Sequence, residues 1–365
     1  MNGNEGIVLA VNAGSSSLKL AVFRAGVPQA ALRISVDRHF DTPPKISGEP
    51  AQVSALALPT SRDYPAFVVE LLASLRPLLP VTAVAHRVVH GGDEARECVP
   101  LPAGERARLH ALAPLAPLHQ PPALAIIDAV AAAQPSRLQF ACLDTAFHAA
   151  LPPVAREYAL PADVRMRHPE LHAYGFHGLS CRWTIEQLRR KQALPARLVI
   201  AHLGSGASVT AVRDGASIAT SMGFSALDGV PMATRPGRLD AGVLLYLLRQ
   251  ERMTVDALED MLYRRSGLLG LSGRSGDMRA LLASDDPRAQ AAVDYFVQRT
   301  AGEIGALAVA LGGIDLLVFT GGIGEHQPAI RERIAALLRA IAPQLAVQVI
   351  ACDEEAVMAA AVFAG

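Results

Sequence analysis

The feature that most constrains the fold of this chain is a pattern that occurs twice. The stretch "IVLAVNAGSSSLKLAVFRAG" begins at Ile7, and "LVIAHLGSGASVTAVRDG" begins about 190 residues later, at Leu198. Each consists of an apolar run, a turn rich in Gly and Ser, a second apolar run and a further Gly. Apolar runs joined by a short glycine-containing turn are typical of a β-hairpin. The repeat is either a chance similarity of two hairpins or the sign of a duplicated domain, each copy opening with the same hairpin.

The rest of the chain alternates between strand-like and helix-like patterns. With 365 residues, against roughly 150 for one domain, the length favours two domains. Alternating strands and helices indicate an α/β fold. Residues 40–59, rich in Pro, Ser and Thr, are expected to be irregular. Strands are predicted at 7–11, 20–23, 81–89, 138–143, 198–202, 208–212, 316–320 and 347–351. Helices are predicted at 64–75, 103–112, 124–133, 180–190, 241–250, 255–265, 287–311, 328–341 and 354–363.

Composition argues against several classes of function. Lys plus Arg and Asp plus Glu are balanced at 34 each, so the charge does not indicate a nucleic-acid or membrane surface, and a small-molecule substrate is the more natural partner. Cys98, Cys142, Cys181 and Cys352 form no C-x-x-C pair, which fits a reducing compartment and gives no zinc or disulfide framework. No apolar run approaches the roughly 18 residues of a membrane span. The first residues lack the basic start of a secretory signal, so a cytoplasmic protein is expected.

Three glycine-rich turns each follow a predicted strand, at 14–17, 204–206 and 321–324. Glycines allow backbone N–H groups to approach an anion closely. One such turn is most often only a turn, but three in one chain suggest a nucleotide held by several loops. The usual single-loop motifs are absent from the sequence: there is no G-x-x-x-x-G-K-[ST], no complete G-x-G-x-x-G and no G-x-S-x-G.

Polar side chains that could bind a ligand or take part in catalysis follow other predicted strands. Arg87, in "AHRVVHGGDE", is a candidate for binding a carboxylate or phosphate, and the alternative is that it forms a surface ion pair. Asp144, in "CLDTAFH", is open to four interpretations: a base, a metal ligand, an orienting group or the N-cap of the next helix. His177, between Phe176 and a glycine, is either a packed structural residue or a catalytic one.

Two long glycine-rich segments add further charged groups. Residues 227–242 carry Arg235, Arg238 and Asp240. Within residues 266–281, a glycine cluster is followed by Asp277-Met278-Arg279 at an expected helix start. Long irregular segments in compact domains are often functional. Glycine loops, loop arginines, histidines and a strand-end aspartate together fit phosphoryl transfer, in which catalysis is mainly positioning and stabilisation of charge.

These motifs resemble those of the acetate kinases, within the short-chain acyl kinases. The matching stretches are "NAGSSSLKL", "HRVVHGG", "LAPLHQPPAL", "DTAFH", "YGFHG", "HLGSGAS", "SGLLGLSG…SGDMR", "VFTGGIGE" and "CDEEAVMAA". The resemblance implies two duplicated ribonuclease-H-like α/β domains with a central cleft, as in sugar kinases, actin and Hsp70. It places one domain at residues 1–147 plus about 354–365, and a nucleotide-binding and dimerisation domain at 148–353. It also implies a homodimer and closure over the cleft.

The implied reaction is acetate + ATP ⇌ acetyl phosphate + ADP by direct in-line transfer, a step toward acetyl-CoA, with Mg²⁺ or alternatively Mn²⁺. Carried over to this sequence, the catalytic group is Asp144, His177 and Arg235; the substrate-binding residues are Arg87 and His119; and the metal residues are Asn12 and Glu354. The implied nucleotide-binding residues are Ser15, Ser17, Lys19, His202, Leu203, Gly204, Ser205, Gly206, Asp277, Met278, Arg279, Gly322, Ile323, Gly324, Glu325 and His326.

The chain also departs from the family's pattern. "TRPGRLDAG" carries Arg238 where the family has an acidic residue, and Ser205 and His326 each replace Asn. Leu179 replaces Thr, and Cys181 replaces a second His. These departures leave the phosphoryl donor open. The acyl chain is open as well, because the walls of an acyl pocket come from scattered apolar residues. The alternatives are a propionate or other short-chain acyl kinase, an acyl kinase with a different phosphoryl donor, and a nucleotide-binding regulator without catalysis.

Overall fold

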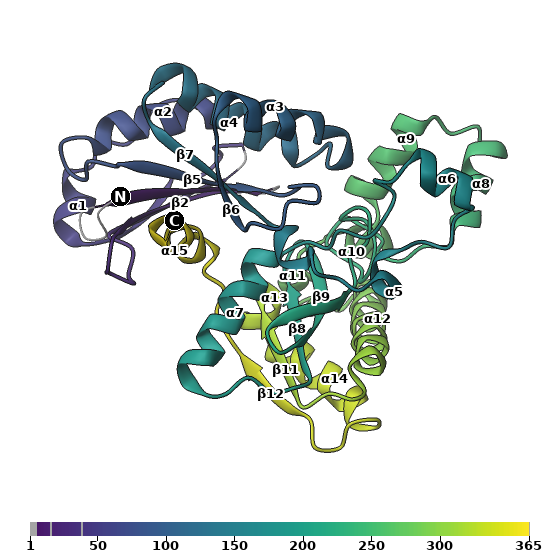
Figure 1. Cartoon of the computed structure of the whole chain (residues 1–365). Coiled ribbons are helices and arrows are strands. Elements are labelled where there is room, and N and C mark those ends of the chain that lie inside the picture. Colours follow the sequence, from purple (N-terminus) through teal and green to yellow (C-terminus); the bar gives the residue numbers. More distant parts are fainter. Residues whose placement is uncertain (1–5, 15–16, 38, 365) are drawn as a thin grey trace. The chain divides into compact units, whose positions relative to one another are not determined.

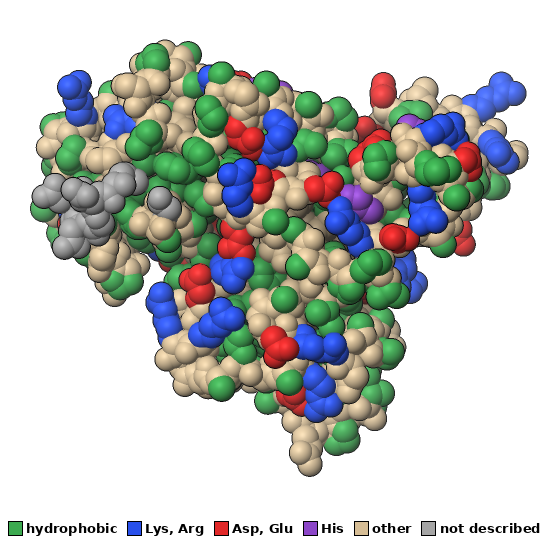
Figure 2. All heavy atoms as spheres, viewed as in Figure 1, with side chains coloured by type: hydrophobic (Ala, Val, Ile, Leu, Met, Phe, Trp, Pro, Cys, Tyr) green, Lys and Arg blue, Asp and Glu red, His purple; other side chains and the backbone are tan. Residues whose placement is uncertain are grey.

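The computed structural model describes residues 6–14, 17–37 and 39–364. The chain divides into two compact units, Met1–Phe147 with Asp353–Gly365, and His148–Cys352. Each unit is built around its own mixed β-sheet (Figure 1). Side chains of both charge signs are interspersed on the face shown in Figure 2, in keeping with the balanced composition. Among the described residues, no helix combines the length and apolar character needed to cross a membrane.

The first unit contains a seven-stranded sheet in the order β4-β3-β2-β1-β5-β7-β6. The strands β1, β2 and β3 form an antiparallel meander, whereas β5 and β7 run parallel to β1. Short strands, β4 and β6, pair antiparallel at the two edges. The bounds are β1 Ile7–Ala13, β2 Ser17–Arg24, β3 Leu32–Asp37, β4 Lys45–Gly48, β5 Ala83–Val88, β6 Cys98–Pro100 and β7 Leu138–Leu143.

Helices cover both faces of this sheet. Figure 1 shows α2 and α4 on one face and α15 on the other. Leu9 of β1, Leu71 of α2 and Ile126 of α4 share one buried cluster, and burial of both faces explains why the central strands read as continuous apolar runs. The bounds are α1 Pro50–Ala55, α2 Tyr64–Leu75, α3 Ala103–Ala111, the 3₁₀ turn η1 Ala113–Leu115, α4 Gln120–Ala133 and α15 Glu354–Ala364. A further 3₁₀ turn, η2 Ala146–His148, lies at the boundary of the two units.

The second unit repeats the same strand pattern. Its sheet has the order β10-β9-β8-β11-β12; β8, β9 and β10 form the antiparallel meander, and β11 and β12 run parallel to β8. This is the arrangement of β3-β2-β1-β5-β7 in the first unit. The predicted duplication is therefore confirmed, since both copies open with the repeated hairpin. The bounds are β8 Leu198–Leu203, β9 Ala207–Arg213, β10 Ala216–Thr220, β11 Leu316–Thr320 and β12 Ala346–Val349.

The helices of the second unit include α12, a long helix that packs against β9 and α14. Asp286 caps its start by accepting a hydrogen bond from the amide of Arg288, and Gly312 ends it in the left-handed conformation. The bounds are α5 Pro153–Arg156, α6 Ala162–Arg167, α7 Gly178–Lys191, α8 Ala241–Arg249, α9 Val255–Asp260, the π-helical turn η3 Met261–Arg265, α10 Gly267–Ser272, α11 Met278–Leu282, α12 Pro287–Leu311, α13 Gly321–His326 and α14 Pro328–Arg339.

The sequence predicted several elements at their observed bounds, among them α2, α12, β7 and β11. The prediction that residues 40–59 are irregular was wrong, because β4 and α1 lie within them. The short strands β3, β6 and β10 were not predicted either; their sheet neighbours, which the sequence does not reveal, stabilise them. The predicted turn at 321–324 is instead the start of α13.

Candidate active site

In the first unit, Arg87 and Asp144 meet at the carboxyl ends of two parallel strands. Arg87 lies near the end of β5, and Asp144 follows β7, its amide donating to the carbonyl of Val88 at 3.0 Å. The guanidinium donates to Oδ2 of Asp144 from Nε at 2.9 Å and from Nη2 at 2.6 Å. Asp144 is completely buried. The carboxylate therefore fixes the plane of the guanidinium.

Asn12, at the end of β1, joins this pair to the start of α15. Its Oδ1 accepts a hydrogen bond from Nη1 of Arg87 at 3.1 Å. Its Nδ2 donates to Oε2 of Glu354 at 2.8 Å and to Oε1 of Glu355 at 2.7 Å. Nη1 of Arg87 also lies 3.4 Å from Oε2 of Glu354. Four predicted residues that are far apart in the sequence, Asn12, Arg87, Asp144 and Glu354, thus form one connected polar cluster. Together with Glu355 they make up what we call the β1–α15 cluster.

Glu355 is a member of this cluster that the sequence reasoning missed. Burial, and then the adjacent charge of Glu354, raise the pKa of Glu355, while Lys19 and the hydrogen bond from Asn12 act in the opposite direction. Lys19 projects from β2 as an exposed residue of the same unit. The repeated glutamate in "CDEEAVMAA" was the available signal, but consecutive helical residues point in different directions and only one of them was assigned.

The β1–α15 cluster has the chemistry of a site for a hard cation. Its potential ligands are the amide oxygen of Asn12 and the carboxylates of Asp144, Glu354 and Glu355, so every donor atom is oxygen. Oxygen donors with one or two carboxylates are what Mg²⁺ prefers. The residues present therefore fit the ion that the sequence predicted for Asn12 and Glu354.

The remaining predicted residues of this unit are His119, Ser17 and Ser15. Half-buried His119 immediately precedes α4. The next residue, Gln120, holds the loop after Arg87 in place, since its side chain accepts from the amide of His90 at 3.2 Å and donates to the carbonyl of His90 at 2.9 Å. Ser17 begins β2, and its carbonyl accepts from the amide of Gly14 at 2.9 Å. Ser15 lies outside the described residues.

In the second unit, the predicted nucleotide-binding segments surround one cavity of about 280 Å³. They come from the turn between β8 and β9, the start of α11, and α13 with the residue after it. These segments are more than 100 residues apart at the extremes of the sequence, and only the fold brings them together. The cavity is lined by Gly204, Ser205, Gly276, Asp277, Met278, Arg279, Gly322, Ile323, His326 and Gln327.

Several predicted nucleotide-binding residues are not part of this lining. They are His202, Leu203, Gly206, Gly324 and Glu325. Glu325 instead connects two backbone segments, because its Oε1 accepts hydrogen bonds from the amides of Gly321 and Cys352, both at 2.9 Å. Gly276 and Gln327 line the cavity although the sequence reasoning did not select them; each adjoins a selected segment, which was the only signal available.

His177 and Arg235 are brought together at Gly206. A methyl group placed on Gly206 would lie 2.7 Å from Nη2 of Arg235 and 3.4 Å from Nε2 of His177. Nδ1 of His177 lies 2.9 Å from the hydroxyl of Ser208, and Nη1 of Arg235 donates to the carbonyl of Ala226 at 2.8 Å. His177 adopts the left-handed conformation, with φ of 58°, which costs free energy for a residue other than glycine. Its position thus depends on the surrounding structure.

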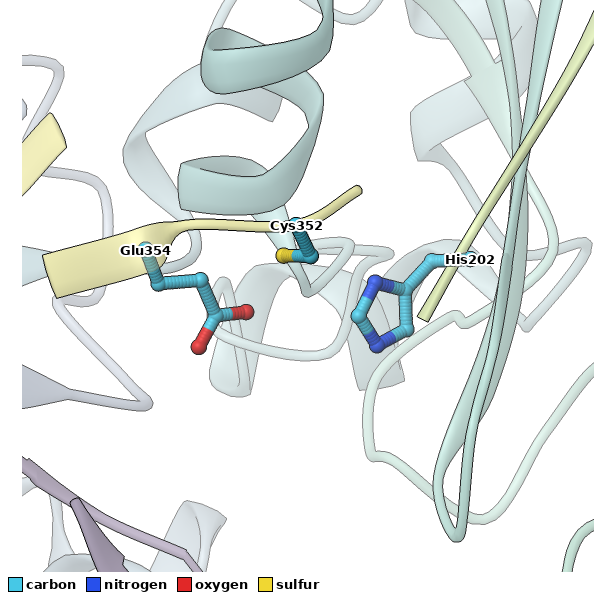
Figure 3. Close-up of side chains that lie close together, drawn as sticks. All are labelled: His202, Cys352 and Glu354. Atoms are coloured by element: carbon cyan, nitrogen blue, oxygen red, sulfur yellow. The ribbon is translucent and has the colours of Figure 1, made fainter. Parts of the chain in front are cut away.

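His202 stands beside this pair rather than in the cavity wall. Its ring stacks on that of His177, with centroids 4.3 Å apart, and its Nδ1 lies 2.8 Å from the hydroxyl of Ser180. The same hydroxyl is 3.4 Å from the thiol of Cys352. Figure 3 shows His202 at the end of β8 and Cys352 on the segment that leads to Glu354, the first residue of α15. His202 thus packs against the ring of His177 and helps to hold it in place.

The departures from the family's pattern fall into two groups. Ser205 and His326 line the cavity. Arg238 does not line the cavity, and it forms an ion pair with Glu303 of α12 at 3.1 Å. Burial raises the pKa of Glu303, and the charge of Arg238 opposes that effect. Leu179 and Cys181 are buried in α7. Only the first two departures thus bear on what the cavity holds.

The chain is similar to known proteins over most of its length. The model of the acetokinase family matches residues 7–360. An acetate kinase of Rhodopseudomonas palustris (strain TIE-1) is 44% identical over 343 residues, which cover 90% of this chain and 85% of the relative. Among solved structures, a propionate kinase from Francisella tularensis subsp. tularensis SCHU S4 superposes with a TM-score of 0.83 at 30% identity, covering 98% of both chains.

An acetate kinase from Entamoeba histolytica also superposes with a TM-score of 0.83, at 27% identity, covering 97% of this chain and 98% of that one. The matches extend over both units rather than over one of them. With its duplicated α/β units, this chain belongs to the acetokinase family.

Proposed function

We propose that this protein is an acetate kinase, which transfers the γ-phosphoryl group of ATP reversibly to acetate and gives acetyl phosphate and ADP. The observation that carries the proposal is that three separate predicted nucleotide-binding segments converge around one cavity of the second unit. Relatives that bear the name acetate kinase, at 44% identity over most of the chain, support the same activity.

This cavity, lined by Gly204, Asp277 and Gly322 among others, is the proposed nucleotide site. Its volume of about 280 Å³ is close to the lower end of the range for small-molecule sites, about 300 Å³. Of the lining glycines, Gly204 donates its N–H to the carbonyl of Gly206 at 2.9 Å, whereas the missing side chain of Gly322 would allow a phosphate to approach the backbone closely. A methyl group on Gly322 would meet nothing within 4 Å, which leaves this part of the wall open to a ligand.

In the first unit, Arg87 is the proposed binding residue for the acetate carboxylate. A guanidinium matches a carboxylate because its fork offers two parallel N–H groups. Asp144, bound to Nε and Nη2, would keep the plane of the guanidinium in one orientation. No strong base is needed, because acetate is already ionised at neutral pH; Asp144 is thus proposed as a positioning residue.

Asn12 and Glu354 are the proposed residues for Mg²⁺. When bound, the ion would neutralise charge on the phosphate oxygens, as in other phosphoryl-transfer enzymes. The hydrogen bonds of Asn12 to Glu354 and Glu355 hold the two oxygen-bearing side chains together. Lys19, on the neighbouring strand, is the proposed contact for the nucleotide phosphates.

Arg235 and His177 are proposed to stabilise the phosphoryl group during transfer. The charge of the transition state is spread over the equatorial oxygens, so donors aimed at that position lower the barrier. Both Nη2 of Arg235 and Nε2 of His177 lie against Gly206, where a methyl group would be 2.7 Å and 3.4 Å from them. The hydroxyl of Ser208, at Nδ1 of His177, would fix the orientation of the ring.

We also propose that the protein is a homodimer. The observation in favour is the set of exposed apolar side chains on α8, Val243, Leu245 and Tyr246, because contiguous exposed apolar residues often mark interaction surfaces. Light scattering coupled to size-exclusion chromatography would give the mass directly. A mass of about 38.5 kDa at all concentrations, that of one chain, would refute the proposal.

The trapping of acetyl phosphate by hydroxylamine tests the activity. Purified protein with acetate, ATP, Mg²⁺ and hydroxylamine should form acetyl hydroxamate, whereas omission of any one component should abolish it. Arg87→Ala should raise the KM for acetate with little change in nucleotide binding. Protein that binds nucleotide but forms no hydroxamate would instead be a nucleotide-binding regulator.

The same assay separates the alternatives within the family. Comparing kcat/KM for acetate, propionate and butyrate gives the acyl preference, and replacing ATP by GTP or pyrophosphate gives the donor. A larger kcat/KM for propionate than for acetate would assign the chain to the propionate kinases, like the Francisella relative.

A further inference from the structure

Cys98 and Cys142 face each other across the strands β6 and β7 of the first unit. They are direct partners in the antiparallel register. Hydrogen bonds flank them on both sides, from Leu143 to Glu97 and from Leu101 to Gln139, each 2.9 Å long, so the cysteines occupy a non-hydrogen-bonded position. At such positions the Cα atoms are about 4.5 Å apart, and disulfides span Cα separations of about 4.4–6.8 Å.

The two sulfur atoms are already close. The thiol of Cys142 donates to Sγ of Cys98 at 3.9 Å. A disulfide requires an S–S separation of about 2.05 Å. Since the backbone spacing at a non-hydrogen-bonded position suits a disulfide, rotation of the side chains supplies most of the remaining approach, and the strands need not separate.

The two thiols differ in access. Cys98 is partly exposed and lies on β6, at the edge of the sheet, whereas Cys142 is buried. The more accessible thiol is the one that attacks an oxidant first, and its buried neighbour then resolves the product.

We propose that Cys98 and Cys142 are a reversible disulfide site for small disulfide oxidants, and that its oxidation lowers phosphoryl transfer. The Cys98 thiolate attacks a disulfide RSSR, forming a mixed disulfide and releasing RS⁻. Cys142 then loses its proton and attacks Sγ of Cys98, releasing the second RS⁻. Two protein thiols are oxidised, one RSSR is reduced to two thiols, and the two protons are carried by the released RSH.

The position of the pair explains why oxidation would affect the reaction. Cys142 precedes Asp144 by two residues on β7, and its Sγ lies 3.9 Å from the carbonyl of Met358 on α15. Drawing this sulfur toward Cys98 changes the contact between β7, which leads to Asp144, and α15, which begins at Glu354. A displacement of about 1 Å in a positioning group can cost on the order of 100-fold in rate, so a loss of tenfold or more is expected.

Oxidised glutathione is the probe for the test, applied to the full-length protein at neutral pH. We expect the intact mass to fall by two hydrogen atoms and a non-reducing peptide map to join the Cys98 and Cys142 peptides. Acetyl hydroxamate formation should fall about tenfold and return on addition of dithiothreitol. Cys142→Ser should instead retain one glutathionyl adduct on Cys98, because the resolving thiol is missing.

Cys98→Ser is the matched control. It lies outside the β1–α15 cluster, so its untreated activity should stay within about twofold of the wild type, while oxidised glutathione should leave that activity unchanged. The proposed site would be overturned if the wild-type protein acquired only glutathione adducts or formed a disulfide between other cysteines. The proposed effect on activity would be overturned if the Cys98–Cys142 disulfide formed and the protein kept its full activity. The activity arm rests on the proposed function, whereas the peptide map is independent of it, so the two can fail separately.

Discussion

The guanidinium of Arg87 places two of its nitrogens, Nε and Nη2, on a single oxygen of Asp144. The side chain of Asp144 is fully buried, and that of Arg87 is 14% exposed. A buried charge is tolerated only with a charged or hydrogen-bonding partner, so each residue of this pair depends on the other. The pair also joins the ends of β5 and β7, and the proposed substrate-binding arginine is therefore held by the core of its own unit.

Replacing Asp144 should reduce both stability and activity. Asp144→Ala leaves the charge of Arg87 without its buried partner, which should lower the free energy of unfolding by about 3 kcal/mol. Asp144→Asn should cost less stability, because the amide oxygen still accepts from Arg87, but it should raise the KM for acetate. Urea unfolding and steady-state kinetics measure the two effects.

An exposed ion pair provides the control for that experiment. Arg165 and Glu157 are 2.8 Å apart, but both side chains are largely exposed, and pairs of this kind contribute about 0–1 kcal/mol. Glu157→Ala should therefore leave stability and kinetics nearly unchanged. If Asp144→Ala were as mild as Glu157→Ala, the pair of Arg87 and Asp144 would not have the importance assigned to it.

Arg235→Ala should reduce kcat on the order of 10³-fold, the effect of removing a transition-state cation in other phosphoryl-transfer enzymes. The KM for ATP should change much less, because Arg235 is not part of the cavity lining. Arg235→Lys should recover only part of the rate, since an ammonium lacks the planar fork. A fall of less than tenfold in the alanine variant would exclude the assigned role.

Gly206→Ala should impair turnover through contact rather than through loss of a functional group. Its methyl would lie 2.7 Å from Nη2 of Arg235, so the guanidinium must move, and we expect kcat to fall at least tenfold. Gly104→Ala is the matched control: a methyl there meets nothing within 4 Å, and alanine is favoured over glycine in a helix by up to about 1 kcal/mol. Equal activities of the two variants would show that Gly206 leaves more space than the structure indicates.

Acid should destabilise the fold between about pH 6.5 and pH 4 through two buried histidines. Burial lowers the pKa of His86 and of His148 from 6.5 to about 4. The unfolded chain therefore binds more protons than the folded chain in this window. The stabilisation is fully present above pH 6.5 and is lost as the pH falls toward 4, on the order of 3 kcal/mol for each histidine.

His86→Gln isolates one of these contributions. Nε2 of His86 pairs with Gln139 at 2.8 Å, and a neutral amide can keep a hydrogen bond there without titrating. Urea unfolding of both proteins from pH 7 to pH 4 should show a shallower loss of stability in the variant. Parallel curves would mean that the pKa of His86 is the same in the folded and the unfolded protein.

The structural role of His148 was not evident from the sequence, which placed it near Asp144 as part of "DTAFH". In the structure its Nε2 lies 2.9 Å from the carbonyl of Phe176, and its Nδ1 lies 2.9 Å from the hydroxyl of Ser217. A carbonyl can only accept, so Nε2 carries the proton and Nδ1 accepts from Ser217. These partners come from segments about 30 and 70 residues away, and no local sequence pattern predicts such contacts.

The sequence by itself determined the α/β class, the duplication, the glycine segments and the family. These depend on local properties: the period of apolar residues, the backbone freedom of glycine, and the order of motifs along the chain. The tertiary structure alone decided that Arg87 is bound by Asp144, that Glu355 joins Asn12, and that Glu325 braces Gly321 instead of lining the cavity. It likewise decided that Arg238 pairs with Glu303 and that Cys98 meets Cys142. The reason is that hydrogen bonds, burial and ion pairing act over a few ångströms in space, and only the folded chain brings residues from distant segments within that range.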